Sequence, residues 1–292
     1  MKILLTGPTG LLGKELLKTA PSNYLIYPTY HKIFTNKQNI YLDITNKKNC
    51  KELIEKLHPD LIIHTAALVN TDYCEKNKTE TYKINFLGTQ NLLEPAIKIK
   101  SKFIYFSSNG VFDGKHPPYS ETDPVNPINY YGKTKAEGEE IVKKYMIHSM
   151  IIRLSNMYGW NDPLERENPA TWLLKRFKDN QKTYMVSDVY NNHLWVGQAA
   201  KAVWKSINKQ LYGNIIHIGG KDTLSRYEFA IELIKIFYFN KNLVIPVKSK
   251  FFKGLAPRPR NTCLSTQKME NLLKINPITV KAGLLKMKKA MK

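Results

Sequence analysis

Short apolar runs alternate with amphipathic segments through the first half of the chain. Apolar residues recur at helical spacing in three of the intervening segments, at 46–57, 82–99 and 129–145. Pro95 lies inside the second segment, where we expect it to kink or break the helix. Strands that alternate with helices predict a parallel sheet covered on both faces. The apolar runs place these strands at residues 2–5, 25–30, 61–64, 103–106 and 150–154.

The pattern becomes less regular after residue 155, where loops rich in Pro and Asn separate shorter elements. We therefore divide the chain into a first domain, residues 1–155, and a second, smaller part formed mainly by residues 156–292. Some elements of the second part are expected to return to the sheet of the first. Its predicted elements are helices at 172–179, 198–207 and 225–239 and a strand at 214–218.

A glycine-rich turn, Thr6–Gly13, follows the first strand directly and opens a helix. Gly7 allows a tight turn, and Gly10 lets the backbone come close to a phosphate. Gly13 lets the helix pack on the strand, and the start of the helix offers free N–H groups to an anion. An ordinary glycine-containing loop is the alternative reading. The position between strand and helix favours a site for the pyrophosphate of a dinucleotide.

The fold class that follows is α/β. We expect a Rossmann-type doubly wound parallel sheet that binds NAD(P) in residues 1–155, with a smaller C-terminal α/β substrate lobe.

The composition is that of a globular protein of the reducing cytoplasm. The 292 residues are 42% hydrophobic, and no apolar run approaches the length of a membrane span. Residues 2–5 are too short for the hydrophobic part of a signal peptide. Cys50, Cys74 and Cys263 lack metal-type spacing and predict no disulfide framework. We expect no metal and no membrane span.

The net charge of +21 raises the question of a nucleic-acid partner. Only six of the 45 basic residues are Arg, and the lysines are spread along the chain rather than gathered in a basic arm. We therefore expect no nucleic-acid partner. A positive field of this size would attract anionic substrates such as nucleotides.

Tyr131 and Lys135 stand four residues apart in a predicted helix, so they share one of its faces. An ammonium beside a phenol favours the phenolate and would give an acid–base group that works near neutral pH. A solvated helix face is the alternative. Ser107 and Ser108 end the strand at 103–106, where ligands bind in open α/β sheets, although turn formation or helix capping would also explain them.

With these motifs together, the chain resembles the extended short-chain dehydrogenase/reductases that act on nucleotide sugars, most of all the dTDP-4-dehydrorhamnose reductase subgroup. The resemblance covers nearly the whole length. It rests on residues 6–13, 41–45, 59–67, 85, 88–92, 107–112, 121–124, 131–137, 257–261 and 264–266.

The resemblance implies roles for individual residues. Tyr131 would protonate the substrate carbonyl oxygen while the nicotinamide delivers hydride to the carbonyl carbon. Lys135 would bind the nicotinamide ribose, and the Ser108 hydroxyl would contact the substrate oxygen. The remaining cofactor contacts implied are Gly7, Thr9, Gly10, Leu11, Leu12 and Gly13 at the pyrophosphate, Asp43 and Ile44 at the adenine, and Ala66 and Ala67 at the adenine-side ribose. Asp43 could instead cap the helix that starts near residue 46.

Cofactor choice can be argued from the end of the second strand. NAD-specific sites usually place an acid there to bind the ribose 2′-hydroxyl. This chain has Tyr30, His31 and Lys32 instead, a cationic group that suits a 2′-phosphate. We expect NADPH, with NADH as the alternative; His31 and Lys32 could equally be ordinary surface residues.

Two departures from the family pattern bear on the substrate. Asn109 and Gly110 stand where the rhamnose-pathway reductases carry Asp-Tyr, which leaves the identity of the sugar open. They also lack the acid pair of nucleotide-sugar dehydratases. Arg258 and Arg260 lie together in a Pro-braced loop and suit a diphosphate, although a surface turn would also explain them. The expected substrate contacts are Ser107, Ser108, Asn109, Tyr131, Asn156, Arg258 and Arg260.

The sequence thus predicts a cytoplasmic, NADPH-dependent reductase of a nucleotide-linked 4-keto-6-deoxy sugar, in deoxysugar or surface polysaccharide biosynthesis. The alternatives are an epimerase of the same superfamily and an NADP-binding regulatory subunit without turnover. The intact set of Ser108, Tyr131 and Lys135 argues against the regulatory role. The oligomeric state is open, with a homodimer as one alternative.

Overall fold

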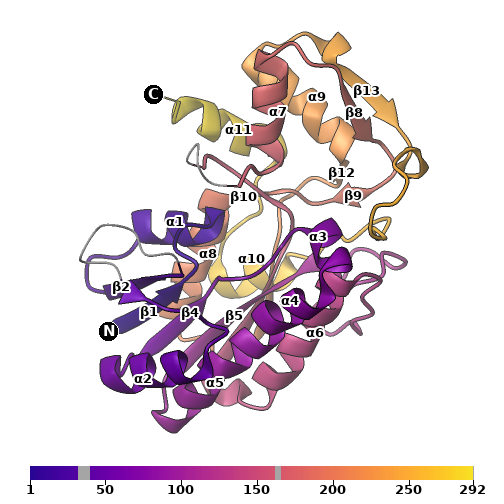
Figure 1. Ribbon diagram of the computed structural model, residues 1–292. Coiled ribbons are helices and arrows are strands. Elements are labelled where there is room, and N and C mark those ends of the chain that lie inside the picture. Colours follow the sequence, from indigo (N-terminus) through magenta and orange to yellow (C-terminus); the bar gives the residue numbers. More distant parts are fainter. Residues whose placement is uncertain (32–39, 162–165, 292) are drawn as a thin grey trace.

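The computed structural model describes residues 1–31, 40–161 and 166–291 and has an α/β architecture (Figure 1). The strands of its central sheet are β1 (Lys2–Thr6), β2 (Leu25–Tyr30), β3 (Ile40–Tyr41), β4 (Leu61–His64), β5 (Lys102–Ser108), β6 (Ser149–Leu154) and β11 (Ile215–Ile218). They lie in the order β11-β6-β5-β4-β1-β2-β3, and every neighbouring pair is parallel. The predicted Rossmann-type parallel sheet is confirmed.

Helices cover both faces of this sheet. Successive residues of β1 point to opposite faces, so Ile3 and Leu5 belong to one apolar core and Leu4 to the other. Burial on both sides explains why the strands read as continuous apolar runs. The helices are α1 (Leu11–Lys18), α8 (Val196–Asn208) and α10 (Gln267–Leu273) on the first face, and α2 (Lys47–Leu57), α5 (Gly88–Lys98) and α6 (Tyr130–Lys143) on the second.

The helix predicted at 82–99 differs from the one observed. It begins earlier, as α4 (Lys78–Tyr82), passes through one π-helical turn (Lys83–Leu87) and continues as α5. The predicted break at Pro95 is wrong, because α5 runs on to Lys98. Pro95 is buried in the core, so tertiary packing outweighs the local preference of proline.

A second cluster of elements forms a lobe with its own apolar core, at the top of Figure 1. Phe177, Leu233 and Leu284 come from three different helices and meet in this core. The elements are α7 (Pro169–Lys178), α9 (Arg226–Phe237) and α11 (Val280–Lys289), with the parallel strands β8 (Thr183–Val186) and β13 (Val244–Val247). From the same half of the chain, β11 joins the central sheet beside β6. The boundary at residue 155 stays a prediction.

The remaining elements of the described ranges are short. They are α3 (Thr71–Lys76), the strand pairs β7 (Met157–Tyr158) with β10 (Leu194–Trp195) and β9 (Tyr190–Asn191) with β12 (Leu224–Ser225), and 3-10 turns at Asn109–Val111, Met146–His148, Lys241–Leu243 and Ser249–Phe251. The lobe lies beyond the carboxyl ends of the sheet strands. Within the described ranges, no helix combines the length and apolar character needed to cross a bilayer.

Candidate active site

The glycine turn is held by close backbone contacts. Gly7 has a φ of +68°, and a Cβ there would lie 2.7 Å from the Ala66 nitrogen. A Cβ on Gly13 would lie 2.2 Å from the Gly7 oxygen. These two positions therefore need glycine for the fold itself. Gly10 is exposed, and its nearest contact for a Cβ is 3.5 Å away, so the space beside it is free for a ligand.

Buried polar contacts tie this turn to the end of β4. The Thr65 hydroxyl donates to the Thr6 oxygen at 2.6 Å and to the Gly7 oxygen at 3.0 Å. The His64 ring lies between Thr6 Oγ1, at 2.8 Å from Nδ1, and Thr89 Oγ1, at 3.1 Å from Nε2. Burial, with the nearby charge of Lys135, lowers the pKa of His64 to about 3. No role was predicted for His64 from the sequence, although its position at a strand end was a signal.

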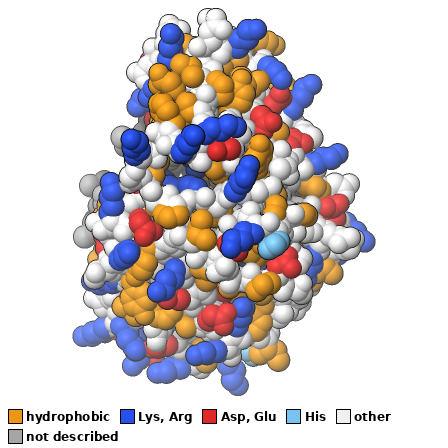
Figure 2. Space-filling model, turned by 90° about the vertical axis from the view of Figure 1, so that its right-hand side faces the viewer, with side chains coloured by type: hydrophobic (Ala, Val, Ile, Leu, Met, Phe, Trp, Pro, Cys, Tyr) orange, Lys and Arg blue, Asp and Glu red, His pale blue; other side chains and the backbone are white. Residues whose placement is uncertain are grey.

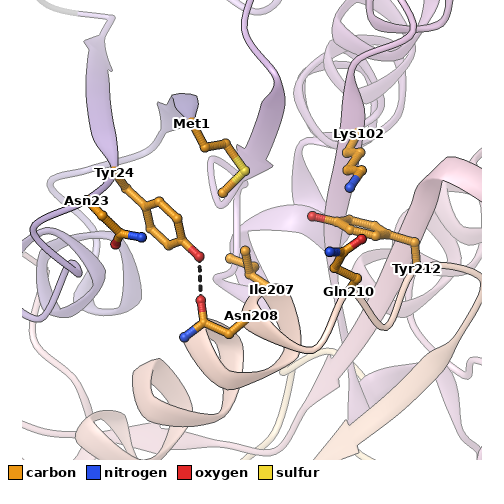
Figure 3. A pocket seen from close by; sticks show the side chains of 8 residues that line it. All are labelled: Met1, Asn23, Tyr24, Lys102, Ile207, Asn208, Gln210 and Tyr212. Atoms are coloured by element: carbon orange, nitrogen blue, oxygen red, sulfur yellow. Dashed lines mark hydrogen bonds between the residues drawn. The ribbon is translucent and has the colours of Figure 1, made fainter.

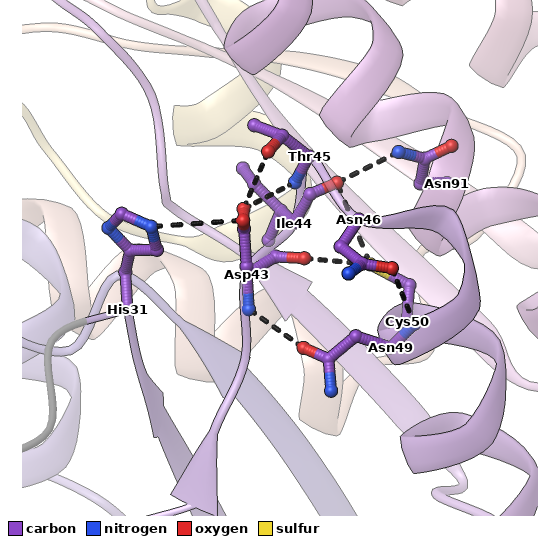
Figure 4. Close-up of polar contacts among 8 residues, drawn as sticks. All are labelled: His31, Asp43, Ile44, Thr45, Asn46, Asn49, Cys50 and Asn91. Atoms are coloured by element: carbon purple, nitrogen blue, oxygen red, sulfur yellow. Dashed lines mark hydrogen bonds and ion pairs between the residues drawn. The ribbon is translucent and has the colours of Figure 1, made fainter.

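Asp43 and Ile44 follow the carboxyl end of β3 (Figure 4). The Asp43 carboxylate accepts bonds from the Thr45 backbone N–H at 2.8 Å and hydroxyl at 2.7 Å. Burial would raise its pKa, but these bonds and the charges of His31 and Lys83 outweigh burial and lower it. The alternative role as a helix cap is wrong for Asp43, because the cap of α2 is Asn46.

His31 is the last residue described before residue 40, and its Nε2 lies 3.9 Å from the Asp43 carboxylate. An imidazole at the end of β2 therefore lies beside the expected adenine site (Figure 4). Lys32 lies outside the described residues. Of the other expected cofactor contacts, Ala66 and Ala67 are half-buried beside the glycine turn.

The turn after β5 and the start of α6 bring Ser108 and Tyr131 together. The side chain of Asn129 caps α6 by accepting from the Gly132 N–H at 2.9 Å. A Cβ on Gly132 would lie 2.2 Å from the Gly110 oxygen, so helix and turn are in direct contact. The Ser108 hydroxyl then lies against the Tyr131 phenol, where its hydrogen bond favours the phenolate. The sequence-predicted pair is thus brought to one point.

Burial outweighs this hydrogen bond and raises the pKa of Tyr131 above its usual value. The predicted lowering by Lys135 is therefore not found. The Lys135 ammonium lies 4.1 Å from the centroid of the Tyr105 ring, while the charge that lowers the Tyr131 pKa comes from Arg166. Burial also lowers the pKa of Lys135 to about 7, against the opposing effect of Glu139.

A buried ion pair fixes α6 behind Lys135. The Arg153 guanidinium donates from Nε and Nη2 to the two Glu139 oxygens, at 2.9 and 2.7 Å, and both side chains are buried. Arg153 Nη1 also lies 3.2 Å from His217 Nε2. This pair was not predicted from the sequence. An Arg inside the otherwise apolar run at 150–154 was the available signal, because a charge in a buried strand needs a partner.

The arginine loop is tied to α3. Arg258 pairs with Asp72 at 2.9 Å, and the Ala256 N–H donates to the other Asp72 oxygen at 2.9 Å. Asp72 thus neutralises the charge expected to hold a diphosphate. Arg260 is exposed in the same loop.

Two further arginines, neither of them predicted from the sequence, act on this region. Arg226 begins α9 and is exposed, yet surrounding protein removes enough water to lower its pKa, and the charge of Arg258 adds to this effect. Arg166 acts electrostatically on Tyr131. Figure 2 shows a hollow between the lobe and the body, with Lys and Arg side chains around it. The scarcity of Arg in the chain was the signal that could have drawn attention to them.

Asn109 lies deeper than expected. It is 3% exposed, and its amide N–H groups donate to Asn191 at 2.8 Å and to the Thr262 hydroxyl at 2.7 Å. It therefore ties β5 to the lobe. Ser107 is also buried, so the geometry does not support substrate contacts for these two residues. Asn156 is half-buried, and its backbone oxygen accepts from the Leu194 N–H at 2.9 Å.

A pocket of about 340 Å³ lies at the amino ends of the sheet strands, opposite the carboxyl ends where Ser108 lies (Figure 3). Met1 and Lys102, at the amino ends of β1 and β5, are part of its wall, and Tyr24 donates a hydrogen bond to Asn208 beside it. It is remote from Ser108, which ends β5, so we do not assign the chemistry to it. The described parts of the chain contain no cluster of His, Cys, Asp or Glu arranged for a metal ion.

Comparison with known proteins agrees with this geometry. The chain is 31% identical over 94% of its length to a dTDP-4-dehydrorhamnose reductase of Aggregatibacter actinomycetemcomitans, of which it covers 94%. It is 28% identical to the methionine adenosyltransferase 2 subunit beta of Bos taurus, over 93% of this chain and 82% of that one.

A dTDP-4-dehydrorhamnose reductase of Bacillus anthracis, solved in complex with NADP, matches the fold with a TM-score of 0.89. The two share 28% identity, and 99% of each chain is covered. The model of the family described as RmlD substrate binding domain matches residues 1–292. The chain therefore belongs to the RmlD substrate-binding-domain family.

Proposed function

We propose that this protein uses NADPH to reduce the 4-keto group of a nucleotide-linked 4-keto-6-deoxy sugar. The observation that carries the proposal is the meeting of Ser108 and Tyr131 at the carboxyl end of β5, with Lys135 one helical turn further on. The similarity to dTDP-4-dehydrorhamnose reductases supports this substrate class.

The residues around the glycine turn fit a dinucleotide. The bare backbone at Gly10 leaves room for a pyrophosphate at the start of α1, where the N-cap offers no side chain to the first N–H groups of the helix. The end of β2 carries Tyr30 and His31 where NAD-specific sites usually have an acid. This difference favours NADPH, with its 2′-phosphate, over NADH. The bound nicotinamide supplies the hydride.

The proton needed for the reduction is available on Tyr131. With its raised pKa, as with the ordinary one, the phenol is protonated at neutral pH and can donate to a carbonyl oxygen that gains charge. The Ser108 hydroxyl beside it would orient that oxygen. Lys135, with a pKa of about 7, would hold the nicotinamide ribose and carries more charge as the pH falls.

Arginines that act on Tyr131 or lie near Arg258 support a nucleotide diphosphate on the substrate side. Asp72 neutralises Arg258, which leaves the positive charges of Arg166, Arg226 and Arg260 in this part of the chain. Guanidinium groups bind phosphate oxygens in a bidentate manner. We assign the diphosphate to this group, with the sugar between it and Tyr131.

Two alternatives give different results in one assay. A spectrophotometric screen would combine dTDP-, UDP-, GDP- and CDP-4-keto-6-deoxy sugars with NADPH and NADH. The proposal predicts a steady fall in NADPH absorbance with at least one sugar. An epimerase would change the sugar without net NADPH consumption. A regulatory subunit, the alternative raised by the similarity to the methionine adenosyltransferase subunit, would bind NADPH with no turnover on any sugar.

A further inference from the structure

Most glycines of this chain are required by the backbone or by packing. All fifteen lie in the described ranges. Four have a positive φ, namely Gly7, Gly114, Gly213 and Gly254. Another group would bring a Cβ to within 2.9 Å of a neighbouring atom, namely Gly13, Gly88, Gly132, Gly138, Gly159, Gly197, Gly219, Gly220 and Gly283. Only Gly10 and Gly110 fall in neither group.

Gly10 is explained by the proposed cofactor, because its bare backbone faces the space for the pyrophosphate. Gly110 has no such explanation. It is half-buried in the 3-10 turn after β5, and a Cβ would meet Ser108 Oγ at 3.4 Å and Tyr131 Cε1 at 3.5 Å, which are ordinary contacts. Alanine would fit this position and would restrict the unfolded chain more than glycine does. A glycine that the fold does not need indicates a close approach by something else.

The atoms around Gly110 define the space that a side chain at this position would occupy. The Gly110 N–H donates to Ser108 Oγ at 3.0 Å, and the Cβ position lies along the edge of the Tyr131 ring. In the proposed function these two side chains bind the carbonyl oxygen. The space beside Gly110 therefore adjoins the sugar carbons next to the reacting carbonyl.

We propose that Gly110 opens a subsite for a substituent larger than hydroxyl on a sugar carbon next to the carbonyl, and that this substituent is an N-acylamino group. This inference rests on the proposed function. A neutral acylamino group is favoured over a free ammonium because the site has two cationic neighbours, Arg166, whose charge acts on Tyr131, and Lys135, one helical turn further along α6.

The test compares two nucleotide-linked 4-keto-6-deoxy sugars that differ only at carbon 3, which carries hydroxyl in one and acetamido in the other. We expect the wild type to prefer the acetamido sugar. Gly110→Ala should lower kcat/KM for that sugar by about tenfold or more, and should change kcat/KM for the hydroxyl sugar by less than about threefold. Gly110→Leu should remove activity on the acetamido sugar. The melting temperature of Gly110→Ala should equal or exceed that of the wild type.

Gly10→Ala is the matched control, because it is the other glycine that the fold does not require. It should weaken NADPH binding and slow both sugars by the same factor. A wild type that prefers the hydroxyl sugar, or a Gly110→Ala variant that slows both sugars equally, would overturn the inference and leave the reductase function standing.

A wild type that reduces neither sugar would instead overturn the proposed function. Calorimetric binding of the same two sugars then still decides the subsite. Loss of affinity by Gly110→Ala for the acetamido sugar alone supports it, and equal affinities of wild type and variant contradict it.

Discussion

Tyr131 and Lys135 show opposite effects of the same burial. Loss of water penalises the charged form of each group, so the pKa of the phenol rises and the pKa of the ammonium falls to about 7. Both groups are therefore shifted toward their neutral forms. A neutral phenol is the form that a general acid needs in a carbonyl reduction.

The buried Lys135 should lower the stability of the fold near neutral pH. Its pKa is about 7 in the folded chain and about 10.5 when unfolded, so the unfolded state binds more protons between these values. Stability is reduced most at and below pH 7 and recovers as the pH rises toward 10.5. Lys135→Met should raise the free energy of unfolding at pH 7 by on the order of a few kcal/mol.

Denaturant unfolding at pH 7 and pH 10 measures this effect. The gain from Lys135→Met should shrink at the higher pH. Lys133→Met, exposed on the same helix, should show little gain at either pH. A Lys135→Met variant that is no more stable than the wild type at pH 7 would show that Lys135 does not destabilise the fold as a buried, partly charged group.

Single residues differ in how far the sequence could place them. Ser108 and Tyr131 could be brought together because one ends a strand and the other begins the helix that follows. The partner of Arg258 could not, because Asp72 lies 186 residues earlier in the chain. Asn109 was expected at the substrate, but its amide is used by Asn191 and Thr262, which only the folded lobe brings near.

At the scale of elements, α6 carries the site and one ion pair holds it to β6. Arg153 on β6 reaches Glu139 on α6, and neither side chain is open to solvent. Because Lys135 lies one turn before Glu139, this pair also positions the lysine. Its removal should therefore disturb the helix as a whole rather than one contact.

Glu139→Gln should destabilise the protein by about 3 kcal/mol, because it leaves the Arg153 charge buried without its counter-ion. The matched control is Glu140→Gln, which breaks the exposed Glu140–Lys143 pair on the same helix and should change stability by less than about 0.5 kcal/mol. Chemical denaturation of both variants gives the comparison. Equal, small effects would show that the buried pair does not hold α6.

Local periodicity predicted the strands and helices of the central sheet because each is buried along a regular face. It missed the pairing of β8 with β13, since these four-residue strands are about 60 residues apart and gain their stability from the lobe core. It also placed an irregularity at Pro95, where packing preserves the helix, and missed the π-helical turn at Lys83–Leu87.

At the scale of the whole molecule, an excess of positive charge surrounds a hollow between lobe and sheet. Such a field increases the local concentration of an anionic nucleotide sugar. Salt screens this attraction, because the Debye length falls from about 30 Å at 0.01 M to about 8 Å at 0.15 M.

The KM for the nucleotide sugar should therefore rise by about threefold or more between 0.01 M and 0.2 M NaCl. Steady-state kinetics over this range, with the melting temperature followed in parallel as a control for unfolding, provide the measurement. A KM that stays constant or falls would show that the net charge does not assist substrate capture.

In the proposed mechanism Tyr131 donates the proton during ketosugar reduction, and the rate of NADPH consumption by Tyr131→Phe measures this role. We expect kcat to fall by about 10²- to 10⁴-fold, with the affinity for NADPH unchanged. Tyr130→Phe, altered at the neighbouring position of the same helix, should keep its activity. Full activity in Tyr131→Phe would contradict the proposed mechanism.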